Sequence, residues 1–322
     1  MNAKANIVIL DGFAANPGDL SWSEFEELGN VTLYDRSQKV DEIISRCKGA
    51  DIVITNKSII SREVMENCPS IKYIGITATG YNVVDMNAAA DFGITVTNVP
   101  AYSTEDVAQM VFSHLLNITN HVALHNDAVK DGEWASCVDF TFWKTPLISL
   151  YGKTLGIIGY GLIGATVAKI AKAFGMNVLV NTRTPSKVKD TDVSVVSLET
   201  LYEKSDVISL HCPLTDVNKG MINKNAISQM KDGVIIINTA RGPLINEEDL
   251  AQALKSGKVY AAGCEVASVE PIKPENPLLT CDNCFITPHN AWATIEARKK
   301  LLKIAAENVR CYLHGTPQNV VS

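Results

Sequence analysis

The sequence predicts an α/β protein built from two doubly wound parallel-sheet domains, and three observations support this fold class. The chain has 322 residues, which exceeds the usual span of one hydrophobic core. Short apolar runs alternate with helical patterns along both halves of the chain. A glycine-rich turn at 159–164 stands between an apolar run and an apolar-faced helix near the middle. A second sheet is therefore expected to begin there, after a complete first domain.

The first part of the chain is predicted to form a flavodoxin-like layer. Strands are expected at 7–10, 31–34, 51–55, 71–76 and 94–97. Helix-like spacing of apolar residues predicts helices at 22–28, 40–47, 62–67 and 83–90. Because strands and helices alternate, we expect an open parallel sheet with crossover helices.

A helix is expected to connect the two domains. Ser103 offers an N-cap with Asp106 as the acid three residues on, and apolar residues continue at helical spacing to Leu116. The next segment, 121–150, is rich in aromatic residues and uneven in period. It is predicted to be a helix followed by a loop that lines a subunit interface.

The alternation resumes at Lys153. Strands are expected at 154–158, 178–180, 207–210, 234–238, 259–266 and 285–287, with helices between them. After Pro288 a long helical pattern runs from 291 to 313, and we expect it to fold back over the first domain. The predicted domains are therefore a discontinuous one, 1–99 plus 291–322, and a continuous one, 100–290.

The glycine turn has the GxGxxG spacing, between a strand and a helix, that dinucleotide-binding folds use. One glycine permits a tight turn, the next lets the backbone approach the phosphates, and the last lets helix and strand pack closely. The residues expected to bind the dinucleotide here are Gly159, Gly161, Leu162, Ile163 and Gly164. Since six strands match a complete dinucleotide fold, 100–290 is predicted to be a Rossmann domain.

The end of the second strand of this domain predicts NADP(H) as the preferred cofactor. An NAD site has a carboxylate there that binds the ribose 2′-hydroxyl. This chain instead has Thr182, 18 residues after Gly164, followed by Arg183 and Thr184. A guanidinium and two hydroxyls can bind a 2′-phosphate by charge-assisted hydrogen bonds. The alternative is a merely solvated basic loop, in which case NAD(H) would also serve.

Composition narrows the class of partner. The net charge of -6 argues against a nucleic-acid or acidic-membrane surface and favours a small-molecule ligand. We see no signal peptide and no membrane-spanning run, so a cytoplasmic protein is expected. Eight scattered cysteines suit a reducing compartment. Cys281 and Cys284 form a lone CxxC without nearby histidines, so no metal site is expected.

Three ionisable residues suit the reduction of a 2-oxo acid. Arg241, Glu270 and His289 each follow a predicted strand of the second domain, where ligands of doubly wound sheets bind. A guanidinium can bind a carboxylate and polarise the adjacent ketone, and an imidazolium can donate the proton. A carboxylate beside the imidazole favours its protonated form. Taken singly, each residue is as well explained by a structural role.

Six motifs, in order along nearly the whole chain, resemble the D-isomer-specific 2-hydroxyacid dehydrogenase family. The motifs are 78–85, 99–104, 159–164, 211–215, the segment around Arg241, and 287–289. The first, second and last look most like the glycerate dehydrogenase, or hydroxypyruvate reductase, branch. The resemblance implies two domains that close over the bound pair, and usually a homodimer.

The resemblance also implies residue roles. Arg241 would bind the substrate carboxylate, His289 would be the acid/base and Glu270 its partner. Backbone amides of Ala78, Thr79 and Gly80 would bind the substrate carboxylate across the interdomain cleft. The cofactor channel would be lined by Cys212, Pro213, Asn218, Thr239, Ala240, Arg241 and His289.

Two further departures from the family pattern are visible. Glu265 stands where the family has an aspartate that holds the nicotinamide amide. Its extra methylene leaves two alternatives: Glu265 still reaches the amide after a small shift, or cofactor positioning is weakened. Leu162 occupies a position where a basic residue is common, which leaves the pyrophosphate to backbone groups and the helix dipole.

The predicted function is reduction of a small 2-oxo acid, hydroxypyruvate or glyoxylate, to a D-2-hydroxy acid. A reductase of bulkier 2-oxo acids is one alternative, because side-chain selectivity depends on first-domain loops and on 134–143. A dinucleotide-sensing protein of the corepressor type is another, since the same fold serves that purpose. Phosphoglycerate dehydrogenase ranks below these, because the first domain shows no obvious basic cluster for a phosphate.

Overall fold

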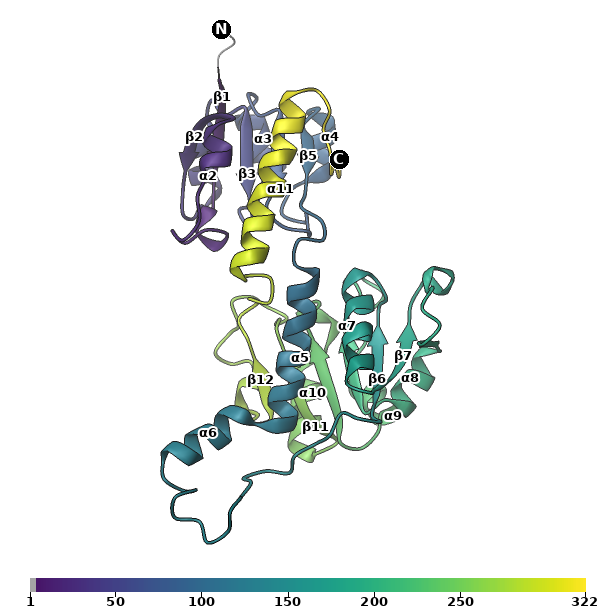
Figure 1. Ribbon diagram of the computed structural model, residues 1–322. Coiled ribbons are helices and arrows are strands. Elements are labelled where there is room, and N and C mark those ends of the chain that lie inside the picture. Colours follow the sequence, from purple (N-terminus) through teal and green to yellow (C-terminus); the bar gives the residue numbers. More distant parts are fainter. Residues whose placement is uncertain (1–3) are drawn as a thin grey trace. The chain divides into compact units, whose positions relative to one another are not determined.

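The computed structural model describes residues 4–322 and divides into two compact units (Figure 1). The first unit contains the chain up to Tyr102 together with Ala293–Ser322, and the second is Ser103–Trp292. Among residues 4–322, no helix combines the length and the apolar character needed to cross a membrane.

The first unit contains a five-stranded, all-parallel sheet. Its strands are β1 (Ala5–Ile9), β2 (Gly29–Leu33), β3 (Ile52–Thr55), β4 (Tyr73–Ile76) and β5 (Thr95–Thr97). They lie in the order β2-β1-β3-β4-β5, which is the flavodoxin-like order. Every residue of β3 and β4 is buried, as expected for central strands covered on both faces.

Short helices flank this sheet. They are α1 (Ser23–Glu26), α2 (Val40–Cys47), α3 (Arg62–Asn67) and α4 (Met86–Asp91), with a 3-10 turn at Gly12–Ala14. Two sequence expectations were too long at their ends. The helix expected at 22–28 is a single turn, and the one expected at 83–90 starts at Met86 because the Asp85 carboxylate caps it by accepting from Ala88 N.

The long C-terminal helix α11 (Ile295–Leu313) packs on the N-terminal segment of the chain. The buried Arg298 guanidinium forms a bidentate pair with Asp19, with N···O distances of 2.7 and 2.6 Å. That pairing holds the pKa of Asp19 below its usual range. The Asn308 amide donates to Asn98 O at 2.9 Å, so both halves of the helix are fastened by buried polar contacts.

The second unit contains a seven-stranded parallel sheet. Its strands are β6 (Thr154–Ile158), β7 (Asn177–Asn181), β8 (Ser194–Val195), β9 (Val207–Leu210), β10 (Val234–Asn238), β11 (Val259–Cys264) and β12 (Cys284–Ile286). The order is β12-β11-β10-β9-β6-β7-β8, the Rossmann order with one added edge strand. The expectation of six strands was wrong because β8 has only two residues, both exposed, and therefore no apolar pattern.

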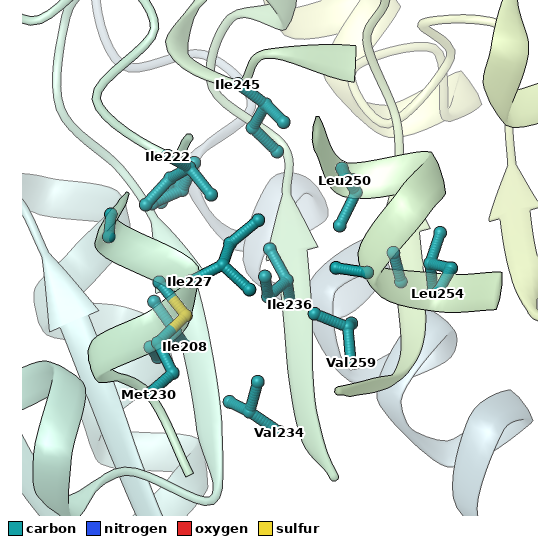
Figure 2. Close-up of a cluster of buried hydrophobic side chains, with 14 of the residues drawn as sticks. Ile208, Ile222, Ile227, Met230, Val234, Ile236, Ile245, Leu250, Leu254 and Val259 are labelled. Carbon is teal, nitrogen blue, oxygen red and sulfur yellow. The ribbon is translucent and has the colours of Figure 1, made fainter. Parts of the chain in front are cut away.

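Helices cover both faces of this sheet, which makes it doubly wound. They are α5 (Thr104–Asn120), α7 (Leu162–Ala173), α8 (Leu198–Lys204), α9 (Lys224–Gln229) and α10 (Glu247–Ser256), with 3-10 turns at Pro185–Lys187, Gly242–Leu244 and Pro277–Thr280. A further helix, α6 (Val122–Lys130), follows α5 and extends away from the sheet (Figure 1). Alternate residues of β10 face opposite sides of the sheet. Ile236 belongs to the hydrophobic cluster that contains Leu250 and Leu254 of α10 (Figure 2). Ile235 and Ile237 belong to the cluster on the other side, which contains residues of α5 and α7.

Helix α5, which was expected to connect the two domains, differs from the prediction at its N-cap. Ser103 occupies the N-cap of α5, but its side chain accepts no capping hydrogen bond. The helix continues to Asn120, four residues beyond the expected end, and stops where His121 adopts a left-handed φ of 46°. Helix α6 follows, and residues 131–150 form a long loop that extends from the sheet of its own unit (Figure 1).

Candidate active site

The turn after β6 is shaped by two glycines that each fill a crowded position. Gly159 has a φ of 98°, and a Cβ there would lie 2.6 Å from Cys212 N, just past the end of β9. A Cβ on Gly164 would lie 2.3 Å from the Gly159 carbonyl oxygen. Both glycines are therefore explained by contacts inside the protein, which bring α7 against β6.

At Gly161, by contrast, no neighbouring atom of the protein excludes a larger residue. It is the N-cap of α7 with φ -89°, and a Cβ there would meet nothing within 4 Å. The first turn of α7 carries no acidic residue, so its N–H groups and helix dipole are open to an anion. The bare backbone at Gly161 thus fits the close approach of a dinucleotide pyrophosphate.

The two residues after Gly161 differ in environment. Leu162 is 65% exposed at the first position of α7, whereas Ile163 packs against the hydrophobic cluster of α5 and α7. A large exposed apolar side chain beside the turn offers no charge to a phosphate. An anion at this turn would therefore be bound by backbone N–H groups.

Thr182, Arg183 and Thr184 follow β7, close to the same turn. Thr184 N donates to Thr182 Oγ1 at 3.3 Å, which folds the loop back on itself. Arg183 is exposed, and its charge acts on Cys212: burial raises the pKa of that thiol, and the guanidinium opposes the rise. Gly159 N donates to Asn181 O at 2.8 Å, two residues before Arg183, and a Cβ on Gly159 would lie 2.6 Å from Cys212 N, so the three segments lie close together.

Asp190 fastens the remainder of this loop, a role that the sequence reasoning missed. Lys172 Nζ on α7 lies 2.6 Å from Asp190 Oδ2, and the Tyr160 side chain of the glycine turn also hydrogen-bonds Asp190. Lys172 holds the pKa of Asp190 below its usual range. The segment that carries Arg183 is thus tied to both the turn and the helix.

The loop after β9 is organised by Asn218. Its Oδ1 accepts from Thr215 N at 2.7 Å, and its Nδ2 donates to Pro213 O at 2.8 Å. Asn218 therefore shapes the loop that contains Pro213, next to Cys212. His211, which sequence reasoning left without a role, is neutral because burial lowers its pKa to about 3, and its ring lies 2.8 Å from Ser209 Oγ.

The side chain of the buried Asn238 hydrogen-bonds the backbone of the loop after β10. Its Oδ1 accepts from Ala240 N at 3.0 Å, and its Nδ2 donates to Arg241 O at 2.9 Å. Thr239 Oγ1 is buried and, within residues 4–322, has no hydrogen-bond partner. An orphaned hydroxyl at the carboxyl end of a central strand fits a site completed by a ligand.

Arg241 is exposed, and its Nη1 donates to Ala240 O at 2.7 Å. The glycine that follows it is required by packing, because a Cβ on Gly242 would lie 1.9 Å from the Ala267 carbonyl carbon. Ala267 N in turn donates to Glu270 Oε1 at 3.2 Å. The Arg241 and Glu270 loops are thereby held side by side.

Glu270 and His289 form a close pair. His289 Nδ1 lies 2.7 Å from Glu270 Oε2, which leaves Nε2 as the ring nitrogen for proton exchange with a ligand. His289 has a left-handed φ of 52°, a conformation that costs a non-glycine residue about 1 kcal/mol or more. Its backbone is held at both ends, since His289 N donates to Glu265 O and Trp292 Nε1 donates to His289 O.

Glu265 does not continue the strand as expected, because β11 ends at Cys264. The side chain is only 1% exposed. One carboxylate oxygen accepts from Thr287 Oγ1 and the other from Ala291 N. Both oxygens are therefore engaged within the protein. The two alternatives drawn from the sequence, contact with the nicotinamide amide or weakened cofactor positioning, did not include these partners.

Ala78, Thr79 and Gly80 lie in the first unit, just after β4. Ala78 O accepts from Val99 N at 3.0 Å, and Thr79 O accepts from Asn98 Nδ2 at 2.7 Å. Within residues 4–322, the three backbone N–H groups have no hydrogen-bond acceptor. Three successive N–H groups without acceptors are suited to binding a carboxylate.

Comparisons with known proteins identify the family of the chain. The family model described as "D-isomer specific 2-hydroxyacid dehydrogenase, NAD binding domain" matches residues 112–291. A hydroxypyruvate reductase of Blautia hydrogenotrophica is 52% identical, covering 98% of this chain and 99% of that protein. A glycerate dehydrogenase of Methylorubrum extorquens is 39% identical, covering 94% and 95%.

Solved structures are also similar over nearly the whole chain, and one of them holds a nicotinamide dinucleotide. An acyclic imino acid reductase in complex with NADPH and D-Arg superposes with a TM-score of 0.85 at 31% identity, covering 98% of this chain and 100% of that one. The glycine turn, the strand-end residues and these similarities lead to one conclusion. The chain belongs to the D-isomer specific 2-hydroxyacid dehydrogenase family, oxidoreductases that bind a nicotinamide dinucleotide.

Proposed function

We propose that this protein reduces a small 2-oxo acid, hydroxypyruvate or glyoxylate, to the corresponding D-2-hydroxy acid. The observation that carries the proposal is the Glu270–His289 pair at 2.7 Å, on loops joined through Gly242 to the Arg241 loop. The names of the relatives, a hydroxypyruvate reductase and a glycerate dehydrogenase, support the choice of substrate.

The roles of the residues follow from their chemistry. The reduced nicotinamide, when bound, supplies a hydride to the carbonyl carbon. His289 donates a proton from Nε2 to the carbonyl oxygen, and Glu270 holds the ring by Nδ1 and stabilises its charged form. Arg241 binds the substrate carboxylate through its exposed guanidinium.

The dinucleotide is proposed to lie along the strand ends of the second unit. Gly159–Gly164 would hold the pyrophosphate, and the loops carrying Cys212, Pro213, Thr239 and Ala240 would flank the remainder. Asn218 would act by shaping the Cys212 loop. The orphaned Thr239 hydroxyl supports a polar contact with the cofactor at that position.

We propose that NADPH is preferred over NADH. No carboxylate follows β7, and Thr182, Arg183 and Thr184 stand there instead. The exposed Arg183 stands two residues after Asn181, whose carbonyl oxygen accepts from Gly159 N at 2.8 Å. The similar imino acid reductase was solved with NADPH, which is consistent with this preference.

Replacing Arg183 by Ala tests the preference. We expect the KM for NADPH to rise about tenfold or more, because a charge-assisted hydrogen bond to the 2′-phosphate is lost, while the KM for NADH stays the same. Steady-state kinetics with each cofactor measure this. Lys255→Ala, which removes an exposed positive charge from α10, serves as the control. Equal changes for both cofactors would contradict the assignment.

A matrix of both cofactors against hydroxypyruvate, glyoxylate, pyruvate and a bulky 2-oxo acid tests the function itself. We expect the highest kcat/KM for NADPH with hydroxypyruvate or glyoxylate. Turnover confined to the bulky acid would replace the proposed substrate by the alternative class. Dinucleotide binding without turnover of any of the four acids would favour a sensing protein.

We further propose a homodimer formed through α6 and the loop after it. Large apolar side chains stand exposed along this segment, with Val122 69%, Phe140 89% and Tyr151 82% exposed. Aromatic and aliphatic side chains gathered on an extended arm are typical of protein–protein interfaces.

A further inference from the structure

Glu265 lies at a junction of several polar contacts around His289. Its two carboxylate oxygens accept from Thr287 Oγ1 and from Ala291 N, two residues before and two residues after His289. Its backbone carbonyl accepts from His289 N at 3.0 Å. One residue therefore binds the His289 loop at three points, with its side chain buried.

The loop has a reason to need this support. His289 adopts a left-handed φ of 52°, which is unfavourable for a residue with a Cβ. Contacts on both sides of the strained residue keep it in that conformation. In this conformation His289 Nδ1 lies 2.7 Å from Glu270 Oε2.

Thr287 connects Glu265 to His114 of helix α5. His114 Nε2 lies 3.0 Å from Thr287 Oγ1. Because the Thr287 hydroxyl donates its proton to Glu265, His114 must be the donor in this contact. Burial lowers the pKa of His114, which is consistent with a neutral ring protonated on Nε2. The chain His114 to Thr287 to Glu265 is thus a buried hydrogen-bond relay with a fixed direction.

We propose that Glu265 is a positioning residue for His289, and that its carboxylate holds the 287–291 loop instead of the nicotinamide amide. This inference rests on the proposed function, because it assigns His289 the proton transfer. The length of the side chain is the critical feature. An aspartate would be shorter by one C–C bond, about 1.5 Å, and could not reach both Thr287 Oγ1 and Ala291 N from the end of β11.

Glu265→Asp and Glu265→Gln separate the two roles. For E265D we expect kcat to fall about 10- to 100-fold, because a displacement of about 1 Å at the reacting group has effects of this size. The dissociation constant of NADPH, measured by nicotinamide fluorescence, should stay within about twofold, since no cofactor contact is lost. E265Q keeps the length and one acceptor, so it should retain more activity than E265D.

Hydrogen exchange at the Ala291 amide adds a readout that does not depend on turnover. In E265D this exchange should be faster, since the acceptor of the amide has withdrawn. Glu248→Gln, which changes an exposed carboxylate on α10, is the matched control.

Thr287 offers a test that leaves Glu265 in place. Thr287→Ser keeps the hydroxyl and should behave like the unmodified enzyme, whereas Thr287→Val should reproduce the fall in kcat with unchanged NADPH binding. This pair replaces the Glu265 variants if those fail to fold.

The inference is overturned if E265D turns over as fast as the unmodified enzyme, or if E265D or E265Q weakens NADPH binding with kcat preserved. Either result would return Glu265 to the nicotinamide. A failure of the proposed function is recognised separately, because the unmodified enzyme would then reduce none of the 2-oxo acids. The exchange rate at Ala291 would still report on the loop in that case.

Discussion

Replacing His289 by Ala is expected to lower kcat by at least about 100-fold, because general acid catalysis contributes about 10²–10⁴-fold. The variant removes the only group proposed to protonate the carbonyl oxygen. It leaves the glycine turn and the loop after β7 intact, so the dissociation constant of NADPH should change little. Stopped-flow measurement of NADPH oxidation with hydroxypyruvate would give the rate of the chemical step.

The natural control is His314→Ala, at an exposed histidine after the C-terminal helix, which should turn over normally. The kcat of Glu270→Gln should lie between those of His289→Ala and His314→Ala, since the amide still contacts His289 Nδ1 but no longer stabilises the charged ring. Near-normal turnover of the His289 variant would contradict its role as the acid.

Replacing Gly161 by Ala is expected to raise the KM for the dinucleotide about tenfold or more, equivalent to at least about 1.4 kcal/mol of binding free energy. The new methyl group meets nothing in the protein within 4 Å, so the thermal denaturation midpoint of the enzyme alone should hardly change. The methyl would instead occupy the space through which the pyrophosphate approaches α7. Calorimetry of NADPH binding, with thermal denaturation of the unliganded variant, measures both effects.

Gly164→Ala supplies the opposite case. Its methyl group would lie 2.3 Å from the Gly159 carbonyl oxygen, so the backbone must move and the denaturation midpoint should fall without any ligand. If the Gly161 variant binds NADPH as well as the unmodified enzyme, the dinucleotide does not approach the chain at this turn.

The fold class and the family could be predicted from sequence because their signals are local or ordered. The glycine turn is recognisable from a strand, a turn and a helix that are continuous in the chain, and the family model matches the residues around it. Helix α2, helix α3 and strands β6, β9 and β10 have the predicted ends, since each helix has a clear apolar period and each strand is a continuous, mainly apolar run. The short strand β8 had no such period and was missed.

The proposed roles of Arg241, Glu270 and His289 came from residue type and position at strand ends. The pairing of Glu270 with His289 joins loops 19 residues apart in sequence, and its 2.7 Å distance is a property of the fold. The need for a glycine after Arg241 likewise follows from the approach of Ala267, which no sequence pattern indicates. The assignment of chemistry to these side chains remains a prediction that the variants above address.

The sequence by itself determined a two-domain α/β fold with a dinucleotide turn, because periodicity and glycine spacing express local backbone requirements. The tertiary structure decided what Glu265 touches. Its partners Thr287 and Ala291 lie 22 and 26 residues away, and His114 reaches Thr287 across 173 residues. Glu265 and Thr287 meet because the parallel neighbours β11 and β12 end along one edge of the sheet, and His114 reaches Thr287 because α5 packs on β11.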